Sequence, residues 1–399
     1  MHATELMKGF PPERAGQVTL ANWRKPPFNK WSFHHVREIV PSANIGNDPS
    51  DIWDLPRAPG DLGSTPLMID GAARSFASFL SDTDTDALVV LHRGRIIYDY
   101  YKPGMDRDTP HILMSVSKSM LGLLAGILVE QGTLDPEALV TSIIPEVEGT
   151  AYDGATLRDL LDMRAGIQFD ENYLASSGAI IEYRKAQGWD PYGLGETPSD
   201  LRSFYSALSE RDGRHGGAFH YVSPNTDLLG WVIERRAGRR FADLMSDLVW
   251  KPLGSGNNAY ITVDRLGAPR CAGGMCTTAE DLARVGELLV RNGRRGSSQI
   301  LPQAWLSDIV SGGDRDAWDK GDFAGYLPGL PVRYRSKWYT LDGPAPMTFG
   351  IGVFGQNLFV DPTNEIVIAK FSSHALPMDN ERIMLTMKGI EAIRCGLVA

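Results

Sequence analysis

Two stretches, one near each end of the chain, have the hydrophobic pattern of β-hairpins. In residues 87–101, two runs rich in β-branched and aromatic residues flank Arg93-Gly94, a pattern that predicts two strands joined by a tight turn. Residues 350–360 and 365–371 flank the turn sequence Asp361-Pro362-Thr363-Asn364, and they predict a second hairpin.

Between these hairpins the apolar spacing changes to that of helices. Most of the predicted helices have a recognisable start or stop, such as a threonine before the first apolar residue or a glycine after the last. A capping-box pattern, Thr277-Thr278-Ala279-Glu280, precedes one apolar run. The predicted helices are residues 119–132, residues 157–163 (between Thr156 and Gly166), a segment that begins at Pro198, residues 228–237 (before Gly238), residues 282–290 and residues 381–397.

Strands at both ends and helices in the middle predict an α+β fold. One antiparallel sheet flanked by helices would be built from both chain ends, with an all-helical part packed beside it. We expect residues 1–110 and 265–399 to form the first unit and residues 111–264 the helical one. Residues 1–60 are rich in Pro, Trp and Asn with little periodicity, and we expect them to form an irregular arm on the surface.

Composition narrows the class of protein. The 399 residues, 43% hydrophobic and 22% charged, are typical of a globular enzyme with two subdomains. The net charge of −9 gives no electrostatic support for nucleic-acid binding. The first residues lack the pattern of a secretory signal, and residues 120–129 are too short an apolar run to cross a bilayer. We therefore expect a cytoplasmic protein without a nucleic-acid or membrane partner.

Cysteine and histidine patterns favour neither disulfides nor metals. The three cysteines, Cys271, Cys276 and Cys395, are too few for a disulfide framework and lack the spacing of zinc ligands. The eight histidines include no H-E-x-x-H pair. We expect no metal and no cofactor.

The sharpest chemical feature is the Ser-x-x-Lys sequence of Ser115 and Lys118, which stands where the buried helix is predicted to begin. Residues three apart on a helix share a face, so Lys118 can reach the Ser115 hydroxyl. A dry setting lowers the pKa of an amine, which can then deprotonate the serine. The N–H of Ser115 at the helix start would face a developing oxyanion. The alternative is a surface lysine that caps a core helix.

A second candidate lies at Tyr221 and Ser223, immediately before a predicted helix. A phenol near Lys118 could transfer protons between nucleophile, base and leaving group. The alternative is a tyrosine packed at a helix entrance with Ser223 or Asn225 as the N-cap. The G-x-G-x-x-G sequence at residues 350–355 runs into a strand rather than a helix, so it does not indicate a dinucleotide site. No G-x-S-x-G motif is present, which disfavours an α/β-hydrolase triad.

Taken together, these motifs resemble the serine β-lactamase-like superfamily of penicillin-recognising enzymes. Within it the chain is similar to the 6-aminohexanoate-dimer hydrolases, amidases that degrade nylon oligomers. The likeness extends from about residue 17 to the C-terminus and includes segments outside the catalytic motifs: LMSVSKS (113–119), YDGATLRDLLDM (152–163), FDENY (169–173), SPNTDLLGWVIER (223–235), TTAEDLARVG (277–286) and GIGVFGQNLFVDP (350–362).

The resemblance implies a β-lactamase-like fold with the catalytic cleft between a sandwich domain and a helical domain. It also implies a role for each matching residue: Ser115 as nucleophile, Lys118 as base and Tyr221 as proton relay; the backbone N–H groups of Ser115 and Val353 as oxyanion hole; and Tyr173, Trp189, Ser223 and Trp338 as substrate-binding residues, with Tyr173 hydrogen-bonding the leaving nitrogen.

The chain departs from the superfamily pattern on the late strand, where Gly350-Ile351-Gly352 replaces Lys-Thr-Gly or His-Thr-Gly. The cation that holds a β-lactam carboxylate is thereby removed, so we do not expect efficient β-lactamase or D-peptidase activity. Glu182 and Asp190 are candidates to hold a substrate ammonium group, which Arg184 would oppose.

The sequence therefore predicts a serine hydrolase of small linear amides and carboxylic esters that works through an acyl-enzyme. Two alternatives stay open. One is a short-chain carboxylesterase or β-lactamase-like relative with little amidase activity. The other is a catalytically silent module that binds an amide or peptide. A homodimer is possible.

Overall fold

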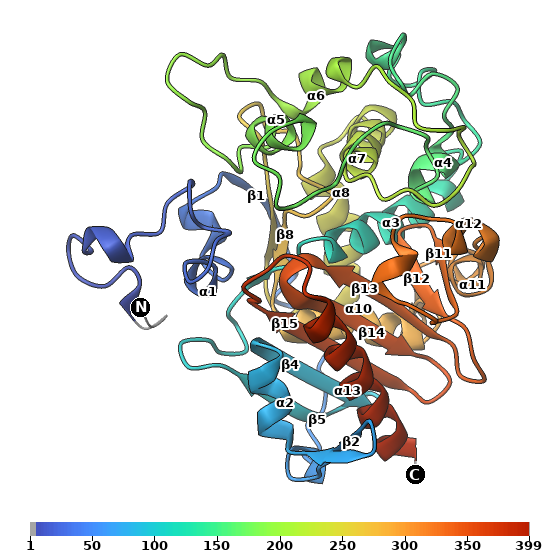
Figure 1. Ribbon diagram of the computed structural model, residues 1–399. Helices are drawn as coiled ribbons and strands as arrows, with labels where there is room; N and C mark the ends of the chain where they lie inside the picture. The colour runs from blue at the N-terminus through green and yellow to red at the C-terminus, as the bar shows by residue number, and fades with distance from the viewer. Residues whose placement is uncertain (1–4, 399) are drawn as a thin grey trace.

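A seven-stranded antiparallel sheet forms the centre of the computed structural model, which describes residues 5–398 (Figure 1). The strand order is β11-β12-β13-β14-β15-β4-β5, so strands from both ends of the chain lie in one sheet. The strands are β4 (Thr85–His92), β5 (Arg95–Tyr101), β11 (Val332–Arg335), β12 (Trp338–Leu341), β13 (Met347–Gly352), β14 (Gln356–Asp361) and β15 (Ile366–Ser372).

Both predicted hairpins are present, and the second differs in one respect. β4 pairs with β5 across Arg93 and Gly94, and both turn residues have positive φ, 52° and 72°, as a type I′ turn requires. β14 pairs with β15. The prediction of one strand over residues 350–360 was wrong, because the chain turns at residues 353–355 and β13 pairs with β14.

Side chains on the two faces of the sheet enter two different cores. Successive strand residues point to opposite faces, so Leu88 and Val90 enter one core while Val89 and Leu91 enter the other. The first core is closed by α2 (Phe76–Asp82) and α13 (Asn380–Val398), and the second by α10 (Ala279–Val290) together with α3 (Val116–Glu130). The predicted terminal helix and the predicted buried helix are thus confirmed.

The middle of the chain folds largely into helices, with corrected boundaries. The prediction of a helix that starts at Pro198 was wrong. The Asp200 carboxylate accepts hydrogen bonds from the N–H groups of Arg202 and Ser203, so the helix starts at Leu201. The cap expected at Thr277 lies one residue later, at Thr278. These helices are α4 (Leu157–Leu161), α5 (Ala179–Ala186), α6 (Leu201–Phe204), α7 (Pro224–Ala237), α8 (Phe241–Met245) and α9 (Lys251–Leu253), with a π-helical turn at Ser246–Trp250.

The middle segment is not entirely helical, and the arm is not entirely superficial. β1 (Ser42–Ile45), β6 (His111–Ile112), β7 (Ala259–Thr262) and β8 (Met275–Thr277) form a second sheet in the order β1-β7-β8-β6. Within the arm, which includes α1 (Asn29–Ser32), Trp23 and Phe33 are buried in a third apolar core. Residues 1–4 of the predicted arm lie outside the described residues. The division into units at residues 110 and 264 stays a prediction.

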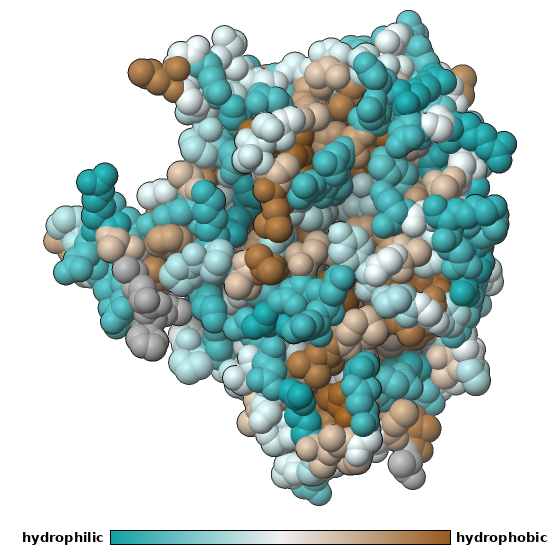
Figure 2. All heavy atoms as spheres, viewed as in Figure 1, coloured by the Kyte–Doolittle hydropathy of each residue, from teal (hydrophilic) through white to brown (hydrophobic). Residues whose placement is uncertain are grey.

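The remaining elements are small: β2 (Leu67–Ile69), β3 (Ala72–Arg74), β9 (Arg294–Arg295), β10 (Ser298–Gln299), α11 (Gln303–Ser311) and α12 (Arg315–Asp319). On the face shown in Figure 2, hydrophilic residues predominate, with apolar residues gathered in patches between them. In the described part of the chain, no helix combines the length and the apolar character needed to cross a membrane.

Candidate active site

Ser115 immediately precedes α3, and its hydroxyl does not cap the helix. The preceding residue, Met114, has a φ of 45°, a left-handed conformation that is uncommon for a residue with a side chain. Ser115 is the N-cap by position, yet its side chain makes no capping hydrogen bond. The Ser115 hydroxyl is therefore not committed to stabilising the helix.

Lys118 is buried rather than on the surface. Its side chain is 2% exposed, and its Nζ lies 2.8 Å from Ser115 Oγ and 2.7 Å from the Ala272 carbonyl oxygen. Burial lowers the pKa of Lys118 from 10.5 to about 7, because desolvation disfavours the charged form. A neutral amine donates one hydrogen bond to Ala272 and keeps its lone pair for the Ser115 hydroxyl.

Tyr221 lies against the same pair of residues, just before α7. Lys118 Nζ is 4.8 Å from the centroid of its ring, and the ring stacks on Phe323 with centroids 4.6 Å apart. Burial raises the pKa of Tyr221, the Glu171 carboxylate raises it further, and a hydrogen bond with the Ser115 side chain works in the opposite direction. The phenol is therefore protonated and in contact with the serine.

A carboxylate that the sequence analysis did not single out, Glu171, completes this cluster. Glu171 Oε1 accepts a hydrogen bond of 3.1 Å from the Tyr173 hydroxyl, and Oε2 accepts one of 2.9 Å from the backbone N–H of Ser223. Its charge raises the pKa of Lys118 against the larger lowering by burial. Glu171 thus links the loop that carries Tyr173 to the start of α7.

A buried ion pair fixes the carbonyl that Lys118 contacts. Arg270 Nη1 lies 2.6 Å from Asp227 Oδ2, and the other Asp227 oxygen accepts a 2.8 Å hydrogen bond from the N–H of Ala272. Both side chains are largely buried, with exposed fractions of 7% for Arg270 and 1% for Asp227. No local sequence pattern indicates this pair, because the two residues are 43 positions apart in the chain.

Two glycines of the 350–355 motif allow β13 to approach the start of α3. A Cβ on Gly350 would lie 2.9 Å from Ser119 Oγ, and one on Gly352 would lie 2.6 Å from the Leu113 carbonyl oxygen. At Gly352 the obstacle is backbone, so no side chain fits there, and at Gly350 the Ser119 hydroxyl would have to move. The motif therefore serves close packing, and it brings the Val353 backbone to the cavity that Ser115 also lines.

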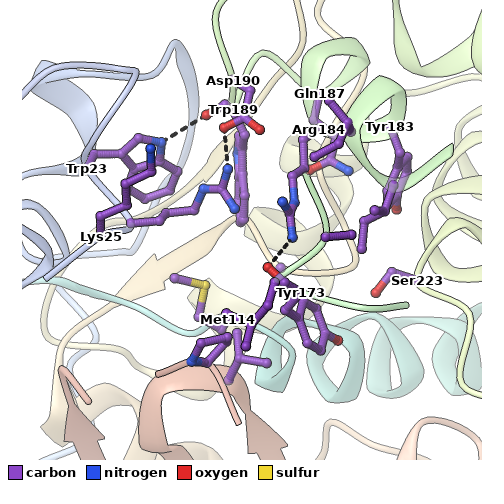
Figure 3. Close-up of a pocket in the computed structure, with 18 of the residues that line it drawn as sticks. Trp23, Lys25, Met114, Tyr173, Tyr183, Arg184, Gln187, Trp189, Asp190 and Ser223 are labelled. Carbon is purple, nitrogen blue, oxygen red and sulfur yellow. Dashed lines mark hydrogen bonds and ion pairs between the residues drawn. The ribbon is translucent and has the colours of Figure 1, made fainter. Parts of the chain in front are cut away.

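The cavity above Ser115 has a volume of about 700 Å³ and brings together segments that are far apart in the chain (Figure 3). They are the arm, the helical region, the segment before β8, the turn after β13 and residues 375–377. Three of the four residues predicted to bind substrate, Tyr173, Trp189 and Ser223, line it. The Trp189 indole donates a 3.1 Å hydrogen bond to the Thr262 hydroxyl and meets Trp23 edge-on, with ring centroids 5.1 Å apart.

The structure does not bring Trp338 to this cavity. Its side chain is fully buried, with 0% exposed, in the core on the α3 and α10 side of the sheet. Strand alternation explains this placement, because Trp338 and Tyr339 enter opposite cores.

The two acidic candidates for holding an ammonium group are both engaged elsewhere. Glu182 does not line the cavity, and its carboxylate pairs with Lys185 at 3.4 Å. Asp190 lines the cavity but forms an ion pair with Arg24. No group of three or more histidine, cysteine or acidic side chains in residues 5–398 is arranged to hold a metal ion.

Comparison with known proteins assigns the family. A family model described as beta-lactamase matches residues 74–387. The chain belongs to the beta-lactamase family. It is 33% identical over 367 residues to the 6-aminohexanoate-dimer hydrolase of Paenarthrobacter ureafaciens, an alignment that covers 91% of this chain and 90% of the relative.

Two further matches bear on fold and activity. A solved structure from Bacillus anthracis, named as a candidate 6-aminohexanoate-dimer hydrolase, superposes with a TM-score of 0.85 and 26% identity, covering 96% of this chain and 98% of that one. Esterase EstB of Burkholderia gladioli is 28% identical over 188 residues, or 44% of this chain and 47% of the relative. This member of the beta-lactamase family is accordingly a serine hydrolase with the β-lactamase-like fold, as the sequence predicted.

Proposed function

We propose that the protein hydrolyses short linear amides and carboxylic esters through an acyl-enzyme on Ser115. The observation that carries the proposal is the 2.8 Å contact between Lys118 Nζ and Ser115 Oγ at an amine whose pKa burial lowers to about 7. About half of this amine is neutral at pH 7, so a base is present next to the nucleophile.

In the first step, the Ser115 oxygen attacks the substrate carbonyl while its proton passes to Lys118. The carbonyl oxygen becomes an oxyanion, and we assign its stabilisation to the backbone N–H groups of Ser115 and Val353. Donors fixed in a water-poor site contribute strongly to such stabilisation. The left-handed residues next to them, Met114 with a φ of 45° and Phe354 with a φ of 63°, are consistent with a backbone held in an unusual shape for this purpose.

Collapse of the tetrahedral intermediate requires a proton on the leaving nitrogen or oxygen. The protonated Tyr221 phenol hydrogen-bonds the Ser115 side chain, so it is suited to deliver that proton and to regain one from Lys118. The Tyr173 hydroxyl, which lies on the cavity wall beside Glu171, would contact the leaving nitrogen of an amide. In the second step, water activated by Lys118 and Tyr221 attacks the acyl-enzyme and releases the acid.

The substrate class follows from what the site contains and from the relatives. β13 presents Gly350 where a β-lactam-binding enzyme needs a cation, which disfavours β-lactams. The likeness to 6-aminohexanoate-dimer hydrolase supports linear amides and makes nylon oligomers candidate substrates. The likeness to Esterase EstB supports the second candidate, a carboxylesterase with little amidase activity.

The test is the turnover of a short-chain p-nitrophenyl ester by Ser115→Ala. We expect the variant to lose hydrolysis while its circular dichroism spectrum stays that of the wild type. The matched control is Ser119→Ala, which removes a buried hydroxyl of α3 that hydrogen-bonds the Lys337 carbonyl instead. This variant should keep its activity. Substantial turnover by Ser115→Ala would overturn the proposal.

A substrate comparison on the wild type separates the remaining alternatives. Turnover of a linear 6-aminohexanoate dimer alongside an acetate ester indicates the amidase, and turnover of the ester alone indicates the carboxylesterase. Binding of the dimer without turnover of either compound indicates the catalytically silent module. We propose no cofactor, and a cytoplasmic location and a homodimer stay predictions.

A further inference from the structure

One wall of the cavity carries a guanidinium group without an acidic partner. Arg184, near the end of α5, donates a 2.7 Å hydrogen bond from Nη2 to the Tyr173 carbonyl oxygen, and it lines the cavity. Within residues 5–398, no carboxylate lies at ion-pair distance from it. The neighbouring Lys185 differs, because it pairs with Glu196 at 2.8 Å. Arg184 thus brings a positive charge to the cavity that the protein leaves without a counter-ion.

An unpartnered amide lines the same cavity one helical turn away. The Gln187 side chain is 1% exposed, and neither its oxygen nor its nitrogen has a hydrogen-bond partner within the described part of the chain. Figure 3 shows Arg184 and Gln187 above Tyr173, among the residues that line the cavity. A buried polar group without a partner destabilises a fold, so a ligand that supplied the missing hydrogen bond would be favoured here.

The carboxylates near this wall are already engaged. Burial and the nearby Arg24 cation lower the pKa of Arg184, whereas Asp190 and Glu171 raise it, so both carboxylates are within electrostatic range. Asp190, however, pairs with Arg24, and both Glu171 oxygens accept hydrogen bonds from Tyr173 and Ser223. A substrate ammonium group would find no free carboxylate and would meet Arg184. A substrate carboxylate would meet a free cation and a free amide donor.

We propose that Arg184 and Gln187 form a binding subsite for a carboxylate at the end of the substrate chain. The preferred substrates would then be half-amides and half-esters of dicarboxylic acids, or linear amides and esters that end in a free acid. This inference rests on the proposed function, since it names the substrate class of the same site. The guanidinium supplies a planar pair of donors that matches a carboxylate, and the Gln187 amide supplies a further N–H.

The test compares acids with their own methyl esters. 4-Nitrophenyl hydrogen adipate carries a carboxylate on the acyl side of the scissile bond, and 4-acetoxybenzoate carries one on the alcohol side. We expect the wild type to favour at least one of these acids over its methyl ester by about tenfold in kcat/KM. In Arg184→Gln this preference should disappear, and in Arg184→Glu it should shift toward 4-nitrophenyl 6-aminohexanoate.

Arg315→Gln is the matched control, because Arg315 does not line the cavity and pairs with Asp319 at 3.0 Å. It makes the same change in net charge and should keep the preference for the acid. A wild type that hydrolyses acids and methyl esters equally well, or an Arg184→Gln variant that keeps the preference, overturns the subsite and leaves the hydrolase intact.

A binding measurement separates failure of the subsite from failure of the hydrolase. On Ser115→Ala, monomethyl adipate should raise the Tm more than dimethyl adipate does, and Arg184→Gln added to that variant should abolish the difference. Equal Tm shifts for the two compounds would contradict the subsite even if no ester is turned over.

Discussion

Replacing Lys118 by methionine should abolish activity and at the same time stabilise the fold. The lysine is fully buried, and burial lowers its pKa from 10.5 to about 7, so the folded protein must hold an amine in a form that water disfavours at neutral pH. Methionine has a similar length and no charge, and it therefore removes this cost. A catalytic base kept neutral by burial is a case in which function opposes stability.

The size of the effect follows from the pKa and from the hydrogen bonds. The fall from 10.5 to about 7, at about 1.36 kcal/mol for each pH unit, corresponds to roughly 5 kcal/mol. Methionine loses the contacts of Lys118 with Ser115 and Ala272 and leaves the Ala272 carbonyl without a partner, which together cost roughly 3 kcal/mol. We expect Lys118→Met to raise the free energy of unfolding by about 2 kcal/mol at pH 7.

Urea unfolding at several pH values provides the assay. Between pH 7 and 10.5 the unfolded chain keeps a proton on Lys118 that the folded protein has lost, so the stability of the wild type rises with pH in this range. The advantage of Lys118→Met should therefore be largest at pH 7 and below. Above pH 7 it falls by about 1.36 kcal/mol for each pH unit, so it should vanish near about pH 8.5 and be reversed at about pH 10, where only the lost hydrogen bonds count. Lys320→Met, at an exposed lysine, is the control. A variant that is less stable than the wild type by the same amount at pH 7 and at pH 10 would refute the reasoning.

Three further predictions concern activity. The kcat/KM for a neutral ester should rise with pH through about 7, because Lys118 acts in its neutral form. Glu171→Gln should move the midpoint of this rise to lower pH, because the Glu171 carboxylate raises the pKa of Lys118, whereas the exposed Glu182→Gln should not move it. An unmoved midpoint in Glu171→Gln would contradict the role of Glu171. Tyr221→Phe should lower kcat by roughly a hundredfold or more with an unchanged circular dichroism spectrum, and a loss below fivefold would argue against the relay. Gly352→Ala should reduce kcat, because the added Cβ would lie 2.6 Å from the Leu113 carbonyl oxygen and would displace β13 from α3. A kcat equal to that of the wild type would show that the close approach of β13 to α3 is not needed.

The sequence predicted the elements whose signals are local. Ser115 and Lys118 are three residues apart on one helix, so their contact depends only on helical geometry. The Arg93-Gly94 turn and the terminal helix follow equally from neighbouring residues. Pro198 misled the prediction because Asp200, two residues later, is the stronger N-cap and sets the start of the helix.

The parts that could not be predicted depend on contacts between distant segments. Glu171 reaches the backbone of Ser223, and the Arg270–Asp227 pair connects α7 with the segment before β8. The packing of β13 on α3 explains the glycines of residues 350–355, a motif that sequence spacing alone associates with nucleotides. Trp338 was placed at the cavity by resemblance, and only the pairing of β12 in the sheet decides which core its side chain enters.

The most direct test of the account is covalent labelling of the wild type with a fluorophosphonate at pH 8, with the modified residue located by mass spectrometry. The account predicts one adduct, on Ser115, and its loss in Lys118→Met, because the serine is reactive only when a neutral amine lies beside it. An adduct on another serine, or labelling of Ser115 at an unchanged rate in Lys118→Met, would contradict it.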